Sequence, residues 1–135
     1  MNRNSPTSLA DHRVEVLLVD ADADVLHRLD TRFRRAGLHP ILATNALEAL
    51  DRMADHPSCR RILTEFTLPG LSGEAWMDLL RTRCEGWSVV VVSARDADPG
   101  HFVLSPKPLD VENLIQHFRR VPVRTVAEVR RRAAS

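Results

Sequence analysis

The sequence is short of several residue types, and each shortage excludes a class of protein. Its 135 residues include no tyrosine and only two cysteines. Two cysteines cannot build the cross-linked framework of a small secreted domain, so we expect reduced thiols. No apolar run approaches the roughly 18 residues of a membrane-spanning helix, and residues 1–10 are too polar for a secretory signal. We therefore expect a cytoplasmic protein with no membrane contact.

The motifs of several common functional sites are missing as well. The five glycines form neither a glycine-rich phosphate loop nor part of a nucleophile elbow. The six histidines lack the spacing of paired metal ligands. Without a helix-turn-helix or similar reading motif, sequence-specific binding of nucleic acid by this chain alone is not expected. These gaps predict a protein that is not an enzyme.

Arginine carries almost all of the positive charge, and much of that charge lies at one end. Of 19 basic residues, 18 are arginine and one is a lysine, Lys107. The net charge is +1, but residues 119–135 carry +5, which leaves −4 for residues 1–118. The basic end is a solvated tail, a linker, or an arm for an acidic partner. So strong a bias makes the position of Lys107 one that needs an explanation.

Apolar runs and helical patterns alternate along the middle of the chain. Short β-branched runs predict strands at 14–19, 41–43, 61–65, 88–93 and 101–104. Four patterns with helical spacing follow the first, second, third and fifth strands, with caps at Asp22 or Asp24, Asn45, Ser72 and Asp110. This alternation is typical of a parallel sheet covered by helices on both faces.

The pattern also predicts where several side chains lie. The helix that opens at Asn45 is expected to bury Leu47, Leu50 and Met53. Trp76 and Trp87 are expected to pack in the core or at its rim. Cys59 and Cys84 precede strands that should be neighbours, so they should lie near one another, as free thiols rather than a disulfide.

The connection between the fourth and fifth strands is too short for a helix. Only residues 94–100 separate them, and this segment contains Pro99 and Gly100. A crossover between parallel strands normally takes a dozen or more residues and includes a helix. We expect a bare loop or a single turn there, with the crossover helix shortened or absent.

Four polar residues stand at strand ends, where parallel strands gather functional side chains. Asp20, Glu65 and Ser93 end the first, third and fourth strands, and Lys107 follows the fifth between two prolines. Together they would form a compact ionic site in which Lys107 offsets the cost of burying the carboxylates. In the ordinary alternative these residues need not meet. Asp20 would then be a helix cap, Glu65 and Ser93 would only end their strands, and Lys107 would be a solvated loop charge.

At these residues the sequence resembles the receiver domain of two-component response regulators. The resemblance spans residues 13–120 and rests on Leu18-Val19-Asp20, Leu68-Pro69-Gly70 with Gly73, Ser93-Ala94, and the run from Lys107 to Asp110. It implies a flavodoxin-like, doubly wound five-stranded parallel sheet in the order 2-1-3-4-5. It also implies a site where an aspartate takes a phosphoryl group from a histidine kinase, with Mg²⁺ held by acidic neighbours.

The match to that phosphorylation site is partial. The resemblance places Asp20 as a metal-binding acid, although Ala21 replaces the second acid of the usual pair. It places Glu65 at the phosphoacceptor position, where an aspartate is expected. Thr67 takes the position whose backbone carbonyl would coordinate the metal. Mg²⁺ binding therefore stays open, with Asp20 as the one remaining metal-binding acid.

The remaining positions carry over less evenly. Ser93 matches the hydroxyl and Lys107 the lysine that bind phosphoryl oxygens in the family. The aromatic switch residue falls on Leu104 when counted back from Lys107, or on Phe102 if one residue is inserted. The missing crossover helix belongs to the family's output and dimerisation face, so a homodimer remains open.

Glutamate in place of aspartate changes the chemistry that the site can perform. The extra methylene moves the carboxylate by about one bond, and an error near 1 Å can cost about 100-fold in rate. Asp22 could replace the acid missing at Ala21, but it is also a good helix cap. We expect a receiver that does not cycle phosphate. Its Glu65–Lys107 pair either holds one signalling state or only stabilises the sheet edge.

The chain divides into a flexible segment at 1–12, the receiver-like domain at 13–120 and a basic tail at 121–135, where Thr125 and Glu128 could cap a short helix. The expected partners are a histidine kinase or an output protein of bacterial signalling. Two alternatives remain: a conventional regulator that accepts phosphate on Thr64, Thr67 or Asp22, and a small nucleotide- or flavin-binding protein on the same fold.

Overall fold

The computed structural model describes residues 13–93 and 102–120 of the chain. Predictions for residues 1–12, for the connection at 94–100 and for the tail at 121–135 lie outside these ranges. The described elements are, in chain order, β1 (Glu15–Val19), α2 (Ala23–Arg35), β2 (His39–Ala43), α3 (Ala46–Asp55), β3 (Arg61–Glu65), α4 (Gly73–Arg83), β4 (Ser88–Ser93), β5 (Val103–Pro106) and α5 (Val111–Arg120).

The five strands form one parallel sheet in the order β2-β1-β3-β4-β5. The strand order predicted from the sequence is therefore confirmed. Both outer strands, β2 and β5, bond to one neighbour only, whereas the apolar β1, β3 and β4 fill the centre. Because all strands run the same way, their carboxyl ends share one edge of the sheet.

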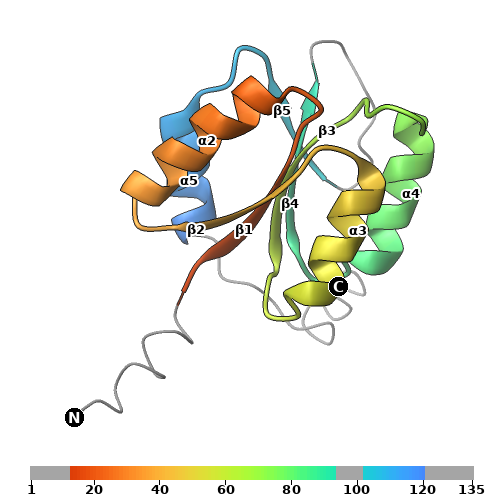
Figure 1. Cartoon of the computed structure of the whole chain (residues 1–135), viewed down its shortest axis with the longest axis horizontal. Coiled ribbons are helices and arrows are strands. Elements are labelled where there is room, and N and C mark those ends of the chain that lie inside the picture. Colours follow the sequence, from red (N-terminus) through yellow and green to blue (C-terminus); the bar gives the residue numbers. More distant parts are fainter. Residues whose placement is uncertain (1–12, 94–101, 121–135) are drawn as a thin grey trace, which may run out of the picture.

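Helices cover both faces of the sheet, as Figure 1 shows. Helices α2 and α5 lie on one face and α3 and α4 on the other, and each pair encloses its own cluster of buried side chains. Alternate residues of a strand point to opposite faces. In β1, Leu17 and Val19 accordingly join the α3/α4 cluster, and Val16 and Leu18 join the α2/α5 cluster.

The predicted caps fix where three helices begin. Asp22 is the N-cap of α2, and its side chain accepts hydrogen bonds from the N–H groups of Asp24 and Val25. Asn45 caps α3 through the Glu48 N–H at 2.8 Å, and Ser72 caps α4 through the Ala75 N–H at 3.1 Å. Each cap satisfies donors that the first helical turn would otherwise leave unpaired.

The predicted core face of α3 is wrong by one residue. Leu47 is 70% exposed, whereas Ala46 and Ala49 are buried and Leu50 and Met53 are partly buried against the core. The buried face follows the spacing i, i+3, i+4, i+7 once alanines are counted as core residues. Their small side chains let the helix lie close to the sheet, and a reading weighted to large apolar residues missed this.

The last strand begins and ends later than predicted. The structure places β5 at Val103–Pro106 rather than 101–104, with Ser93 opposite Pro106. Proline cannot donate to the ladder, but an edge strand needs hydrogen bonds on one side only. Pro106 can therefore be the last residue of the strand. The later end places Lys107 directly after the strand.

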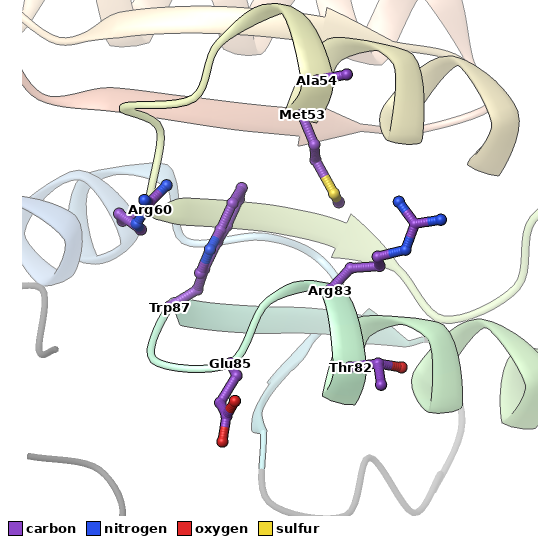
Figure 2. A pocket seen from close by; sticks show the side chains of 7 residues that line it. All are labelled: Met53, Ala54, Arg60, Thr82, Arg83, Glu85 and Trp87. Atoms are coloured by element: carbon purple, nitrogen blue, oxygen red, sulfur yellow. The ribbon is translucent and has the colours of Figure 1, made fainter. Parts of the chain in front are cut away.

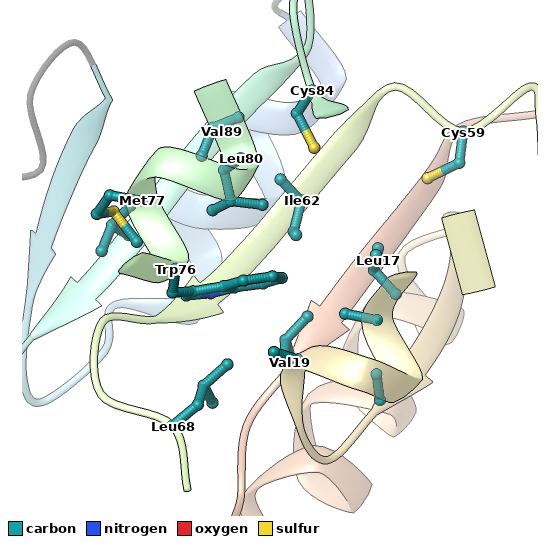
Figure 3. Close-up of a cluster of buried hydrophobic side chains, with 14 of the residues drawn as sticks. Leu17, Val19, Cys59, Ile62, Leu68, Trp76, Met77, Leu80, Cys84 and Val89 are labelled. Atoms are coloured by element: carbon teal, nitrogen blue, oxygen red, sulfur yellow. The ribbon is translucent and has the colours of Figure 1, made fainter. Parts of the chain in front are cut away.

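The α3/α4 core cluster is centred on Trp76, which Figure 3 shows reaching from α4 over β3. The ring is fully buried, and its Nε1–H donates to Thr64 Oγ1 at 2.9 Å. The Thr64 hydroxyl in turn donates to the Glu65 carbonyl oxygen at 3.0 Å. The polar atoms of this buried pair are thus satisfied, and they tie α4 to the end of β3.

Both cysteines are buried free thiols, as predicted. Burial raises the pKa of Cys84 to about 12 and also raises that of Cys59. A thiol must ionise to react. These two therefore behave as apolar core residues.

We predict that Thr64 and Trp76 are energetically coupled. Thr64→Val leaves the indole N–H unpaired, and Trp76→Phe removes the hydrogen bond that the Thr64 hydroxyl accepts, so each variant should lose stability by about 1–3 kcal/mol. The double variant should cost less than the sum by about 1 kcal/mol, because no polar atom of the pair is left buried alone. Urea unfolding of the four proteins measures this, and strictly additive losses would contradict the coupling.

Candidate functional site at the carboxyl edge of the sheet

Four strands deliver the predicted site residues to one edge of the sheet. Asp20 follows β1, Glu65 ends β3, Ser93 ends β4, and Lys107 follows β5. Strand pairing sets Glu65 beside Val92, and Ser93 beside Pro106. The carboxylate and the ammonium therefore reach each other across the end of β4. The ordinary reading, in which these residues need not meet, does not hold for Glu65 and Lys107.

A direct contact joins Lys107 to Glu65. The Lys107 Nζ donates to Glu65 Oε1 at 2.6 Å. The Glu65 side chain is only 15% exposed and that of Lys107 is 42% exposed. The pair is therefore half-buried, with the acid inside and the ammonium stem toward solvent. A charged hydrogen bond in this position is stronger than an ion pair between fully exposed side chains.

Opposing influences act on the ionisation of this pair. Burial raises the pKa of Glu65, and the charge of Asp20 and a hydrogen bond to it raise the pKa further. Lys107 acts in the opposite direction but does not outweigh them. For Lys107, the hydrogen bond from its ammonium to Glu65 is the main cause that raises the pKa. An ion pair by itself would lower the pKa of the acid and raise that of the base, but here both pKa values are raised. The reason is that Glu65 is more deeply buried and lies beside a second acid, whereas Lys107 is nearer to solvent.

Asp20 and Asp22 are engaged with backbone groups. Asp20 is 8% exposed, and its Oδ1 accepts a hydrogen bond from the Asp22 N–H at 2.8 Å. Asp22 uses its own Oδ1 to cap α2. Ala21 lies between them and is exposed. Asp22 therefore acts as a helix cap in this structure. Ala21, at the position of the missing second acid, offers only a methyl group.

The donor set at this edge does not fit a Mg²⁺ site. Mg²⁺ requires near-octahedral oxygen ligands and usually one or two carboxylates beside water and phosphate. Here Glu65 Oε1 is occupied by an ammonium, Asp20 Oδ1 by an N–H, and Ala21 supplies no ligand. Across residues 13–93 and 102–120, no three acidic, histidine or cysteine side chains are placed to hold a metal together. The positive charge beside Glu65 comes from Lys107.

The loop between β3 and α4 is held next to the site. The Phe66 N–H bonds to the Val92 carbonyl at 2.8 Å, which continues the β3–β4 ladder past Glu65. The loop turns at Gly70, with φ +79°, which glycine adopts without strain. A Cβ at Gly73 would overlap the Phe66 ring. Thr67, on this loop, is exposed.

Thr64 is the supporting residue whose role sequence reasoning missed. It was considered only as an alternative phosphoacceptor, yet its side chain is fully buried and bonded to Trp76 and to the Glu65 backbone. The signal was present in the alternation of β3, because Ile62 and Thr64 face the same way. Its environment argues against Thr64 as a phosphoacceptor.

The two candidates for an aromatic switch lie at and before β5. Phe102 is half-buried and packs against the α3/α4 core cluster just before β5 begins. The backbone of Leu104 pairs with Val91 inside the strand. Lys107 follows, joined to Pro108 by a cis peptide bond. The assignment of Phe102 as a switch residue stays a prediction.

Solved structures that superimpose on this chain include receiver domains. The chain superimposes on a response regulator receiver domain from Francisella with a TM-score of 0.67 and 23% identity, covering 78% of this chain and 93% of that one. The chemotaxis protein CheY4 of Vibrio cholerae gives a TM-score of 0.70 and 17% identity, covering 82% of this chain and 99% of that one. The receiver domain of the hybrid histidine kinase CckA gives a TM-score of 0.67 and 19% identity, covering 78% and 96%.

These similarities establish the fold: α/β, flavodoxin-like, with the strand order of CheY. No protein-family model matches the sequence, and no curated protein matches it. None of the described helices is long and apolar enough to cross a membrane. The agreement with receiver domains is thus one of architecture.

The opposing influences on Glu65 predict an unusual pH dependence of stability. Because its pKa is raised above the ordinary 4.5, ionising Glu65 costs stability as pH rises through the raised value. Glu65→Gln cannot ionise, so the free energy of unfolding of the wild type should fall relative to that of the variant over this window. Urea unfolding between about pH 4 and about pH 8 measures the difference.

Glu48→Gln is the matched control with the opposite expected sign. Hydrogen bonds from the Thr44 N–H and hydroxyl lower the pKa of Glu48. A lowered pKa gives stability above the ordinary value that is lost as pH falls through the lowered one. The free energy of unfolding of the wild type should therefore rise relative to that of Glu48→Gln as pH rises. If the wild type is also stabilised relative to Glu65→Gln as pH rises, then Lys107 lowers the pKa of Glu65 by more than burial raises it.

Proposed function

We propose that this chain is an atypical receiver domain in two-component signalling that works without phosphorylation. The observation that carries the proposal is the 2.6 Å contact between Glu65 at the end of β3 and the lone lysine, Lys107. In the receiver-like arrangement, that lysine would bind a phosphoryl oxygen. Here a protein carboxylate already holds its charge, so the pairing that phosphate would create exists without phosphate.

Three further observations support a domain that does not cycle phosphate. The Glu65 Oε1 accepts a hydrogen bond from the Lys107 ammonium, which weakens this carboxylate as a nucleophile. Ala21 supplies no acid, and Asp22 is used as a helix cap. A metal ion that would neutralise an incoming phosphoryl group therefore lacks a fitting set of ligands. We propose that Mg²⁺ has no role in this domain.

The proposed activity is protein–protein interaction in the cytoplasm, with no catalysis by this chain. The partner would be a histidine kinase, an output protein or a second copy of the chain. The fixed Glu65–Lys107 pair would hold the β3–α4 loop and the end of β5 in one arrangement, which a partner could recognise. Fold likeness to receiver domains motivates this class of partner.

A conventional regulator that accepts phosphate elsewhere is the second candidate. Thr64 is buried and bonded, and Asp22 caps α2, which argues against both. Thr67 is exposed on the loop beside the site and is the alternative acceptor that remains. A small nucleotide- or flavin-binding protein on this fold is the third candidate, and an absorbance spectrum with a nucleotide thermal-shift panel would detect it.

Intact-mass measurement after incubation with a small phosphodonor and Mg²⁺ tests the proposal. The wild type should gain no phosphoryl group. Glu65→Asp should restore little labelling, because Ala21 still leaves the site short of an acid, and Glu65→Asp with Ala21→Asp should restore more.

Peptide mapping of any labelled wild-type protein decides between the first two candidates. A phosphoryl group on Thr67 would establish the conventional regulator and end the proposal. Equal, strong labelling of Glu65→Asp alone and of the double variant would contradict the role given to Ala21.

A further inference from the structure

A pocket lies at the end of the sheet opposite to Glu65 and is shown in Figure 2. It has a volume of about 430 Å³, within the roughly 300–1,000 Å³ range of ligand pockets. The ends of α3 and α4 and the turns before β3 and β4 form its walls. Its lining residues are Met53, Ala54, Arg60, Thr82, Arg83, Glu85 and Trp87. Arg60 and Glu65 stand five residues apart on either end of β3, roughly 16 Å.

Trp87 stands in this pocket with its two faces in different surroundings. The Arg60 guanidinium lies over the ring, 5.8 Å from its centroid. Two hydrogen bonds hold Arg60 there: its Nη1 donates to the carbonyl oxygens of Pro57 at 2.6 Å and of Cys59 at 2.7 Å. Figure 2 shows Met53 and Arg83 on the other side of the ring. That side offers an aromatic surface and a thioether to an apolar group.

Arg83 gives the pocket a positive charge without a paired acid. Within residues 13–93 and 102–120, no carboxylate forms an ion pair with Arg83 or Arg60. Arg81, two residues before Arg83 on α4, differs in being paired with Asp78. Guanidinium groups bind carboxylates in a bidentate fork. Glu85 also lines the pocket, but Figure 2 shows its carboxylate turned away from Arg83. Two arginines against this one acid leave the pocket with a net positive charge, so it favours an anionic group next to an apolar one.

The backbone around the pocket favours a carboxylate over a phosphate. Helices α3 and α4 end here, so they present carbonyl groups rather than the N–H groups that cradle phosphates at helix N-termini. No described glycine-rich turn supplies such a cradle. The partial negative charge of these helix ends opposes every anion, but it opposes a doubly charged phosphate more than a singly charged carboxylate. The carboxylate can pair with the guanidinium of Arg83, and an attached peptide can place its apolar side chain against Trp87.

We propose that this pocket binds an acidic peptide segment of a partner protein. An Asp or Glu carboxylate of that segment pairs with Arg83, and a neighbouring aromatic or large apolar side chain packs between Trp87 and Met53. The interaction does not involve the Glu65–Lys107 pair. It gives the domain a second docking surface, at the other end of β3, whatever the state of the first site.

A selection from random short peptides displayed on phage tests this proposal on the full chain. The expected result is enrichment of peptides that combine an acidic with an aromatic or large apolar residue. Binding of synthetic copies should shift the NMR signals of the Trp87 indole N–H and of Arg83. Replacing the acid of the peptide with its amide should weaken binding at least tenfold, which needs no change to the protein.

Arg83→Glu should also weaken peptide binding at least tenfold, whereas the matched variant Arg81→Glu on the same helix should leave it within about twofold. Inorganic phosphate and nucleotides, tested by the same NMR shifts, should not compete. The proposal fails if no such peptides are enriched, or if replacing their acid with the amide leaves their affinity unchanged. It also fails if Arg81→Glu matters as much as Arg83→Glu, or if nucleotides bind the pocket better than the peptides.

Discussion

The Lys107–Glu65 hydrogen bond is the interaction on which the carboxyl edge of this domain depends. Burying the Glu65 carboxylate beside Asp20 is costly, and the ammonium 2.6 Å away offsets part of that cost. The bond forms only because β3 and β5 end on either side of β4. Proline at the end of the edge strand places the lysine directly after it. The contact therefore depends on the strand order, on the length of β5 and on the chain's one lysine.

In the proposed function, the same contact is the reason why the domain works without phosphate. A phosphoryl group would have to displace Lys107 from Glu65, without a second acid at Ala21 to hold a metal ion. Beneath the site, Thr64 links the Glu65 backbone to Trp76, so the position of the acid is fixed by the core as well as by its charge partner. We propose that an edge neutralised by its own Glu65–Lys107 pair serves recognition by another protein rather than a cycle of modification.

Much of this arrangement was predictable from the sequence. The alternation of apolar runs predicted a parallel sheet covered by helices on both faces, and the resemblance to receiver domains implied its strand order. The strand-end residues predicted the meeting of Glu65 with Lys107. The errors have local physical causes. Small alanines, not Leu47, form the buried face of α3, and the edge position of β5 tolerates Pro106 within the strand. The partner of Thr64 depends on packing between distant elements, which no local pattern encodes.

Because Lys107 is the chain's one lysine, selective ¹⁵N-lysine labelling tests the central claim most directly. Its side-chain ammonium gives a single NMR signal, free of overlap from other lysines. In the wild type we predict a shifted signal with slowed hydrogen exchange, as expected for an ammonium bonded to a half-buried carboxylate. In Glu65→Gln the shift and the slow exchange should be lost. A signal that is fast-exchanging in the wild type, or unchanged in Glu65→Gln, would contradict the account.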